Sequence, residues 1–294
     1  MTETPDPGKR RVALVFGGRS GEHDVSIVSA RSIDRALDRE RYQVLPMAID
    51  RRGLWADAET ARRVLAESSD RADDVVRFEG RYRLDPRLLE DAVDVAFPVL
   101  HGPYGEDGTV QGLFEMLDLP YVGSDAASSA LCMDKIFCKR MLVQADLPTP
   151  AWVELDRRSW VEDRDGIVER SSALGLPLFV KPARLGSSVG ISKVSDTNDL
   201  APAIEIALDH GDRALVERGL DVREIEIAVL GNQHPRAAVP GEIVPGHEFY
   251  DYDDKYVDSA CELLAPAPLD ELTTAAAQDL GVKVFRLLGC SGMA

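Results

Sequence analysis

Lysine is rare in this sequence, so a lysine inside a patterned segment is informative. Lysine and arginine together number 34 among 294 residues, and only seven of these are lysine. A chain that uses arginine for generic positive charge keeps lysine for places that need a compact ammonium group. Lys181 stands at such a place, because it ends the apolar run Leu178–Lys181 and precedes the turn Pro182–Ser188. An ammonium group there can neutralise a phosphate.

The segment around Lys181, LFVKPARLGSSVG over residues 178–190, predicts two strands joined by a Gly/Ser-rich loop. Backbone N–H groups and serine hydroxyls of such a loop can close over phosphates. The P-loop pattern GxxxxGK(S/T) is absent, so this is not a P-loop. A hairpin without a ligand is the alternative, but such a hairpin does not need a lysine at a buried strand end.

Glu217 closes a second apolar run, in the segment LVERGL over residues 215–220. A carboxylate at the end of a strand can accept a hydrogen bond from an adenine amino group or from a ribose hydroxyl. As an isolated observation this pattern is weak.

Two glycine-rich segments follow apolar runs near the start of the chain, GGRSGEHD over residues 17–24 and HGPYGEDG over residues 101–108. The first predicts an anion site at a helix N-terminus, but it is not GxGxxG and does not indicate a nicotinamide cofactor. Glu22 is either a functional carboxylate or a first-turn residue that the helix dipole stabilises. His101 is either a site residue or a structural histidine. The adjacent Glu106 and Asp107 point in different directions, so a metal chelate between them is not expected.

The elements that must position these residues alternate between strand and helix, which predicts an α/β fold with sites at the carboxyl ends of the strands. A single helix is expected over 124–147, a linker over 147–151 and an ordered surface loop over 246–258. The expected strands cover residues 11–16, 42–49, 93–100, 178–181, 189–194, 214–217 and 224–230, and the other expected helices lie at 25–37, 109–117 and 269–288.

Composition indicates a globular protein and excludes several classes of partner. The formal net charge is −17, which disfavours nucleic acid and an anionic membrane surface. The sequence has no run of about 18 apolar residues for a membrane span and no apolar segment of a signal peptide. The four cysteines have no CxxC spacing and are expected to be reduced thiols in the cytoplasm.

Taken together, GGRSGEHDVS, HGPYGEDG, MDK, FVKPARLGSSVGISKV, VERGLDVREIEIAVLG and GEIVPGHEFYDYDDKY resemble the D-alanine–D-alanine ligases of the ATP-grasp superfamily. The motifs run in family order from residue 11 to residue 294. The resemblance implies a three-domain ATP-grasp architecture (α+β in the ATP-grasp part), expected here as an N-terminal α/β substrate domain (1–128), a central lid domain (129–211) and an incomplete C-terminal domain (212–294). It also implies ATP and D-alanine as substrates, a magnesium or manganese ion, a role in peptidoglycan precursor synthesis, and a homodimer.

The resemblance further implies roles for individual residues. Glu22 holds the ammonium group of the first D-alanine and His101 lies beside that substrate, while Ser187 and Tyr256 hydrogen-bond with Glu22 and close a loop over the site. Lys255 faces the phosphates and is also expected to contact substrate. The residues expected to bind ATP are Lys135, Phe179, Lys181, Ser188, Glu217, Arg218, Leu220 and Glu224.

One part of the family pattern is missing. The family's magnesium ligands and an arginine follow a Gly-Cys-Ser-Gly-like segment, and this sequence stops at GCSGMA, residues 289–294. We therefore expect an incomplete sequence, with the metal ligands beyond Ala294 and the activity of this chain in doubt. The alternatives are a D-alanine–D-lactate or D-alanine–D-serine ligase and a non-catalytic ATP-binding protein. Tyr256 favours D-alanine as second substrate, because the D-lactate ligases usually carry histidine there.

Overall fold

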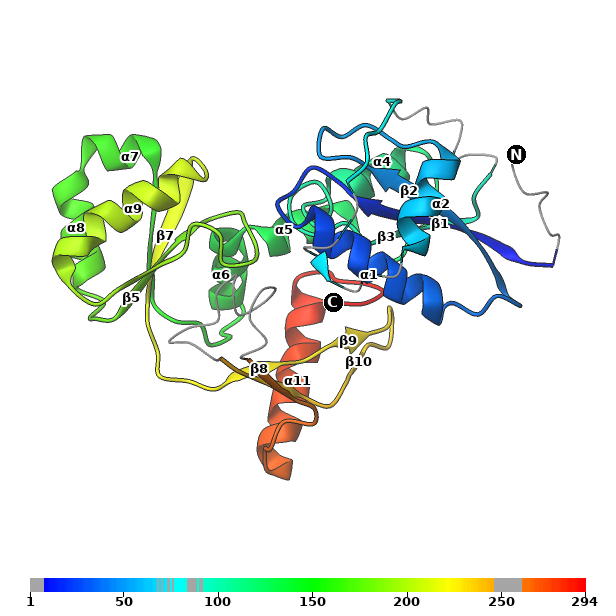
Figure 1. Cartoon of the computed structure of the whole chain (residues 1–294). Helices are drawn as coiled ribbons and strands as arrows, with labels where there is room; N and C mark the ends of the chain where they lie inside the picture. Colours follow the sequence, from blue (N-terminus) through cyan, green and yellow to red (C-terminus); the bar gives the residue numbers. More distant parts are fainter. Residues whose placement is uncertain are drawn as a thin grey trace. The chain divides into compact units, whose positions relative to one another are not determined.

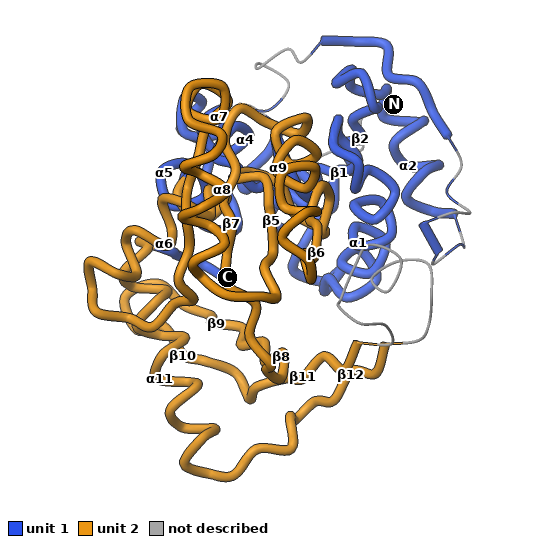
Figure 2. The backbone as a smooth tube through the Cα atoms, turned by 90° about the vertical axis from the view of Figure 1, so that its left-hand side faces the viewer, with its two compact units in different colours: residues 1–130, 290–294 blue, residues 131–289 orange. Residues whose placement is uncertain are grey.

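The computed structural model describes residues 8–67, 69, 71–72, 75, 77–83, 89, 92–245 and 261–294. The chain divides into two compact units, drawn in different colours in Figure 2. Unit 1 contains residues 1–130 and 290–294, and unit 2 contains residues 131–289. Both mix strands and helices, which confirms the α/β fold class (Figure 1).

Unit 1 is built on a parallel sheet in which β1 (Arg10–Gly17) lies between β2 (Tyr42–Ile49) and β3 (Val95–Pro98). Alternate β1 residues point to opposite faces, and both faces are covered, as is usual for a parallel sheet. Leu14 and Phe16 pack with α1 (His23–Ala36) and α2 (Ala58–Ala66). Ala13 and Val15 pack with Val110 and Phe114 of α4 (Thr109–Met116). The carboxyl ends of the three strands therefore share one edge of the sheet.

Unit 2 contains a four-stranded antiparallel sheet in the order β4 (Trp152–Asp156), β7 (Arg213–Arg218), β5 (Leu178–Pro182), β6 (Ser192–Val194). One face packs on three helices, α7 (Arg157–Glu162), α8 (Arg164–Ser172) and α9 (Leu200–Asp209, preceded by the 3-10 turn Thr197–Asp199). On the other face Ile136 of α6 (Lys135–Gln144) packs against Ala183 and Leu215. Lys181 of β5 lies on this face of the sheet, and Lys135 and Lys139 lie on α6.

The helix expected over 124–147 is wrong in one respect, because Asp134 divides it into α5 (Ala126–Met133) and α6. Asp134 has an extended backbone (φ −92°, ψ 100°), and its side chain caps α6 by accepting from the Phe137 N–H. It also forms an isolated bridge with Arg184. A short polar side chain that bonds the backbone favours a helix start over a helix interior.

The rest of unit 2 consists of short strands and one long helix. β11 (Gly241–Val244) lies between β8 (Glu224–Glu226) and β12 (Glu262–Leu264), while β9 (Val229–Leu230) and β10 (Arg236–Ala237) form a hairpin. Helix α11 (Glu271–Leu287) packs on that hairpin. Gly281 of α11 allows the approach, since a Cβ there would lie 3.3 Å from Ile227 Cγ2.

The expected linker and one expected domain boundary can be compared with the observed units and strand pairs. The segment 147–151 lies inside unit 2, between α6 and β4, and so does not link the two units. The expected boundary at residue 212 would assign β7 to the last domain, yet β7 pairs with β4 and β5 in one sheet. A boundary between a central and a last domain would therefore lie after Arg218. The division into three domains stays a prediction.

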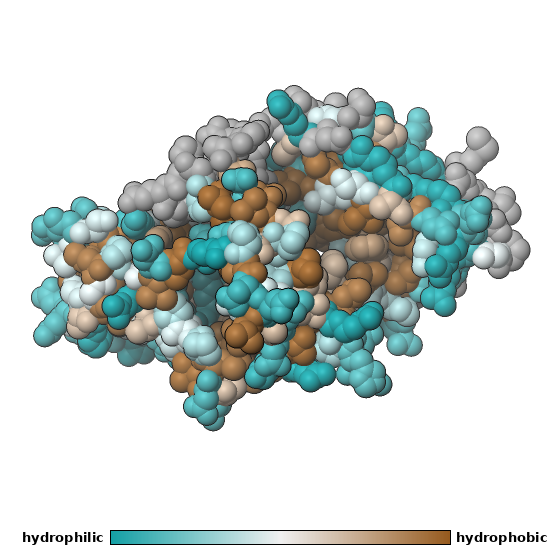
Figure 3. Space-filling model, turned by 90° about the horizontal axis from the view of Figure 1, so that it is seen from below, coloured by the Kyte–Doolittle hydropathy of each residue, from teal (hydrophilic) through white to brown (hydrophobic). Residues whose placement is uncertain are grey.

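Hydrophilic and hydrophobic residues lie side by side on the face drawn in Figure 3. Among the described residues, no helix is both long and apolar enough to cross a membrane.

Candidate functional site

In unit 1 the loops after β1 and β3 are joined by a buried serine. Ser26 Oγ accepts from the Gly17 N–H (2.8 Å) and donates to the Val99 carbonyl (2.5 Å). Gly17 has a left-handed backbone (φ +89°), and a Cβ there would lie 2.3 Å from the Ile49 carbonyl oxygen. Only glycine fits this turn, which places the start of α1 beside the loop that follows β3.

Glu22 is the residue that meets this second loop. It is the N-cap residue of α1 but makes no side-chain capping bond. Its carboxylate lies against Gly102, where a Cβ would be only 2.4 Å from Glu22 Oε2. Gly102 also has a positive φ of +70°. The structure thus brings Glu22 and the loop 101–108 together, and the shared substrate site that the family resemblance implies stays a prediction.

His101 is half-buried and held at both ring nitrogens. Its Nε2 lies 3.0 Å from Ser29 Oγ and its Nδ1 lies 3.5 Å from Glu106 Oε1. The other oxygen of Glu106 accepts from the Gly102 N–H (2.8 Å), whereas Asp107 accepts from the N–H groups of Tyr104 and Thr109. The two neighbouring carboxylates therefore have different hydrogen-bond partners.

Sequence reasoning missed His23, which is buried beside the glycine turn. Its Nδ1 lies 2.7 Å from the Gly18 carbonyl oxygen, and its ring lies 5.7 Å from that of Phe78. Burial lowers the pKa of His23, and the nearby Arg51 adds to this effect. A neutral imidazole therefore supports the turn. The available signal was a histidine directly after Glu22 in a helical first turn.

In unit 2 a row of side chains crosses the sheet on the face beside α6. Glu217 in β7 is opposite both Trp152 in β4 and Phe179 in β5. Lys181 is two residues along β5 from Phe179, so it is on the same face; its ammonium nitrogen lies 5.6 Å from the Phe179 ring centroid. The strand register thus brings the carboxylate of one motif beside the aromatic ring and the lysine of another.

Glu217 is buried, and each of its carboxylate oxygens faces a lysine. Lys139 Nζ lies 2.5 Å from Oε1, and Lys181 Nζ lies 2.5 Å from Oε2. Burial raises the pKa of the carboxyl group, but the two ammonium groups outweigh burial and hold this pKa below its ordinary value. Lys139 was not among the predicted site residues. Its spacing of four residues from Lys135, in a chain with seven lysines, was the signal that could have found it.

Lys135 lies at the root of the loop after β5. Its backbone N–H donates to the Ala183 carbonyl (2.9 Å) and its Nζ to the Leu185 carbonyl (2.5 Å). The preceding residue, Asp134, is fully buried and accepts from Arg184 Nε (2.8 Å) and from Arg213. The start of α6 is therefore fixed to the loop that begins at Ala183.

That loop contains an unusual backbone. Ser187 and Ser188 are consecutive and both left-handed, with φ values of +49° and +60°. Residues other than glycine rarely adopt this conformation, and a strained loop of this kind is a reason to look for a function. Both serines are half-buried.

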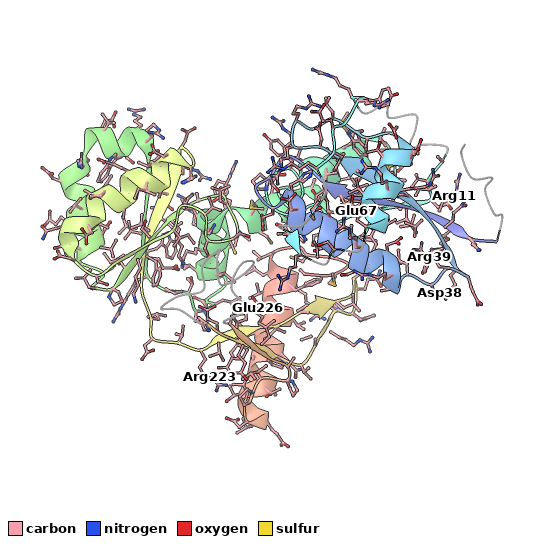
Figure 4. The ribbon with its side chains drawn as sticks, viewed as in Figure 1. Arg11, Asp38, Arg39, Glu67, Arg223 and Glu226 are labelled. Atoms are coloured by element: carbon pink, nitrogen blue, oxygen red, sulfur yellow. The ribbon has the colours of Figure 1, made fainter. Side chains whose placement is uncertain are left out.

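The remaining predicted nucleotide residues follow Glu217. Arg218 and Leu220 are exposed, and the Gly219 N–H between them donates to the Pro177 carbonyl (2.8 Å). Glu224 begins β8, and Figure 4 labels its neighbours Arg223 and Glu226. Arg223 makes two bonds of 2.6 Å to Glu242 in β11, so the strand that carries Glu224 is anchored by a bidentate ion pair.

Lys255 and Tyr256, and the whole of the loop expected over 246–258, lie outside the described residues. Within the described ranges, no group of three or more His, Cys, Asp and Glu side chains is placed to hold a metal ion.

Two cavities of about 400 and 420 Å³ lie beside the start of β2, lined among others by Lys9 and Tyr42. None of the predicted site residues lines either of them. Those residues belong to both units, with Glu22 and His101 in unit 1 and the nucleotide set in unit 2.

Comparison with known proteins gives a family for both parts of the chain. Residues 11–124 match the family model described as D-ala D-ala ligase N-terminus, and residues 141–294 match D-ala D-ala ligase C-terminus. The chain belongs to the D-alanine–D-alanine ligase family. A D-alanine–D-alanine ligase of Thermoanaerobacter sp. (strain X514) is 44% identical over 301 residues, which cover 97% of this chain and 82% of the relative. A second family member, from Chloroherpeton thalassium, is also 44% identical, with the same coverage of both chains.

Solved structures of the family have the same fold. The D-alanine–D-alanine ligase from Coxiella burnetii superposes with a TM-score of 0.80 at 33% identity, covering 98% of this chain and 80% of that one. The VanG D-Ala:D-Ser ligase from Enterococcus faecalis gives a TM-score of 0.78 at 33% identity, covering 97% of this chain and 84% of that one. The ATP-grasp fold expected from the motifs is confirmed.

Proposed function

We propose that this protein is an ATP-dependent ligase that joins two molecules of D-alanine into D-alanyl-D-alanine for peptidoglycan precursor synthesis. One observation carries the proposal beyond family membership. Lys135 Nζ donates to the Leu185 carbonyl of the loop that contains the left-handed Ser187–Ser188 pair, and Lys181 lies near the end of β5, the strand that leads into this loop. A loop of backbone N–H groups and hydroxyls next to two lysines is suited to polyphosphate.

The proposed reaction has two steps. A carboxylate oxygen of the first D-alanine attacks the γ-phosphorus of ATP, so that an acyl phosphate forms and ADP leaves. The amine of the second D-alanine then attacks the acyl carbon, the peptide bond forms and inorganic phosphate leaves with the electron pair of the broken C–O bond. Lys135 and Lys181 would stabilise the phosphate charge, which is the main demand of phosphoryl transfer.

For the amino acid substrates, we propose that Glu22 binds the ammonium group of the first D-alanine and that His101 lies beside it. The position of Glu22 against Gly102 and the fixed ring of His101 support this assignment. Ser187 would hydrogen-bond with Glu22 together with Tyr256, and Lys255 would contact substrate. An acyl phosphate is hydrolysable, so these loops would also have to exclude water.

For the nucleotide, we propose that Glu217, Arg218 and Leu220 bind the adenine edge and that Phe179 lines the base. Ser188 would contact the phosphates, and Glu224 would accept from the ribose hydroxyls. The register that places Phe179 opposite Glu217 supports a common adenine site on this face of the sheet.

The metal expected from the family is magnesium or manganese. No cluster of ligands within the described ranges fits such an ion, so no step above is assigned to it. The expectation that the ligands lie beyond Ala294 stays a prediction. A cytoplasmic location, a homodimer and the absence of nucleic-acid and membrane partners are part of the proposal.

A D-alanine–D-serine ligase is the second candidate, because a solved structure with that name is 33% identical to this chain. A D-alanine–D-lactate ligase and a non-catalytic ATP-binding protein are further alternatives. Mass spectrometry of the products formed from Mg-ATP and D-alanine, with D-serine or D-lactate added in turn, separates them. We expect D-alanyl-D-alanine as the main product in every mixture. A dominant mixed product would identify one of the related ligases, and ATP binding without any product would favour the non-catalytic protein.

A further inference from the structure

The two lysines that face Glu217 are not equivalent. Both ammonium groups lie 2.5 Å from a carboxylate oxygen, but the Lys139 side chain is 9% exposed and the Lys181 side chain is 24% exposed. Lys181 stands in β5 just before the serine loop, whereas Lys139 lies on α6 behind the carboxylate. Of these two lysines, Lys181 is therefore the one on the strand that leads into the Ser187–Ser188 loop.

Lys139 is held in place by all of its donors. An ammonium group has three N–H donors, and that of Lys139 faces three acceptors: Glu217 Oε1 at 2.5 Å, Thr149 Oγ1 at 2.6 Å and the Pro150 carbonyl at 3.0 Å. It also lies 5.0 Å from the centroid of the Trp152 ring, at a distance where a cation and an aromatic face attract. Lys139 is thus a fixed charge beneath the sheet.

Nucleotide binding makes different demands on the two lysines. If Lys181 turns from Glu217 to a phosphate group, the buried carboxylate loses one of its two countercharges. An ionised carboxylate in a buried place is costly unless another cation remains beside it. Lys139 is that cation, and the oxygen that Lys181 vacates becomes free to accept from the adenine amino group.

We infer that Lys139 is a positioning residue of the nucleotide site: it keeps Glu217 ionised and oriented while Lys181 moves to the phosphates. The inference rests on the proposed ATP-dependent function. Helix α6 then serves the site twice from one face, because residues four apart are neighbours on a helix. Lys135 faces the phosphate loop and Lys139 faces the adenine carboxylate.

The test is the affinity for a non-hydrolysable ATP analogue, AMP-PNP with Mg²⁺, measured by calorimetry in Lys139→Met. Without nucleotide this variant keeps Lys181 beside Glu217, so it should fold. In its complex Glu217 has no countercharge and must take up a proton. We therefore expect a loss of nucleotide affinity that is larger at about pH 8 than at about pH 6. At about pH 8 the loss should be at least about tenfold for each unit by which nucleotide binding raises the pKa of Glu217. The heat of binding should vary with the buffer, since a proton is taken up.

Three further variants separate positioning from damage to the fold. In Lys139→Met with Glu217→Gln, the amide needs no countercharge, so affinity at about pH 8 should exceed that of Lys139→Met and proton uptake should vanish. Lys139→Arg keeps the charge and should bind without proton uptake, even if Lys139→Met does not fold. Lys283→Met is the matched control, because Lys283 is exposed on α11 and pairs with Asp279 at 2.6 Å.

The inference would be overturned if Lys139→Met bound the nucleotide with wild-type affinity at every pH. It would also be overturned if Lys139→Met lost affinity without taking up a proton and adding Glu217→Gln did not restore that affinity. A folded wild-type protein that does not bind the nucleotide would instead contradict the proposed function itself.

Discussion

The carboxylate of Glu22 lies at the start of α1 and against the backbone of Gly102. At the residue scale, this contact favours a functional carboxylate over a residue that only complements the helix dipole, and the role of Glu22 stays a prediction. A residue that only complements the helix dipole has no need to touch the loop after β3. Asp24 is the natural comparison, because it is acidic, lies in the same first turn and pairs with Arg51 at 2.6 Å.

Glu22→Gln should raise the KM for D-alanine by roughly tenfold or more, since a charge-assisted bond to the substrate ammonium is lost. The affinity for ATP should not change. Asp24→Asn removes the same type of charge from the same turn and should leave the KM unchanged. Steady-state kinetics of both variants provide the measurement, and equal KM values would mean that Glu22 acts only on the helix.

His23 predicts a pH dependence of stability. Its pKa is lowered in the fold by burial, so the unfolded state binds more protons once the pH falls below about 6.5, the ordinary pKa of histidine. The stability that a neutral His23 contributes is complete above that pH and decreases as the pH falls towards the lowered pKa. The free energy of unfolding in urea at about pH 5.5, 6.5 and 7.5 should show this decrease. His23→Gln should reduce this dependence of the free energy of unfolding on pH, whereas His210→Gln, at an exposed position, should not. If the dependence is unchanged in His23→Gln, His23 is not its source.

At the scale of elements, the site depends on how α6 is attached to the loop after β5. Asp134 ends α5, caps α6 and binds Arg184 and Arg213, so one buried side chain fixes the position of Lys135. The expected single helix over 124–147 missed this break because the helical pattern continues through it. A capping residue inside a continuous helical pattern can be recognised only together with its tertiary partners. For Asp134 these are Arg184 and Arg213, which lie 50 and 79 residues away in the sequence.

Asp134→Asn keeps the cap but removes the charge from the two arginine contacts. The free energy of unfolding should fall by about 1–3 kcal/mol. Asp134→Ala should cost more, because the cap is lost as well. Urea denaturation of the two variants tests the order. If both lose the same amount, the cap contributes nothing and the arginine contacts account for the whole effect.

Local patterns predicted most strands and the hairpin of β5 with β6, but not the pairing of strands that lie far apart in the sequence. The single strand expected over 224–230 is wrong, because β8 and β9 divide it and belong to different sheets. The strand expected over 42–49 has the bounds of β2, and the one expected over 214–217 lies inside β7. The row of Trp152, Glu217 and Phe179 depends instead on the register between β4, β7 and β5, which the sequence does not encode locally. Lys139 was missed for the same reason, since its partners come from β7 and the 147–151 segment.

At the scale of the whole molecule, a chain with a net charge of −17 is proposed to bind a polyanion. Long-range attraction does not favour that binding, so local charge must provide it. We propose that Lys135, Lys139 and Lys181 provide this local charge. All three lie in unit 2, whereas Glu22 and His101 lie in unit 1. Under the proposed function neither unit alone would suffice for ligation.

The most direct test of the proposed function is the release of inorganic phosphate from Mg-ATP by the full-length protein, with and without D-alanine. We predict that phosphate appears only when D-alanine is present, together with an equal amount of D-alanyl-D-alanine. Phosphate release that does not depend on D-alanine, or D-alanine turnover without the dipeptide, would contradict the account.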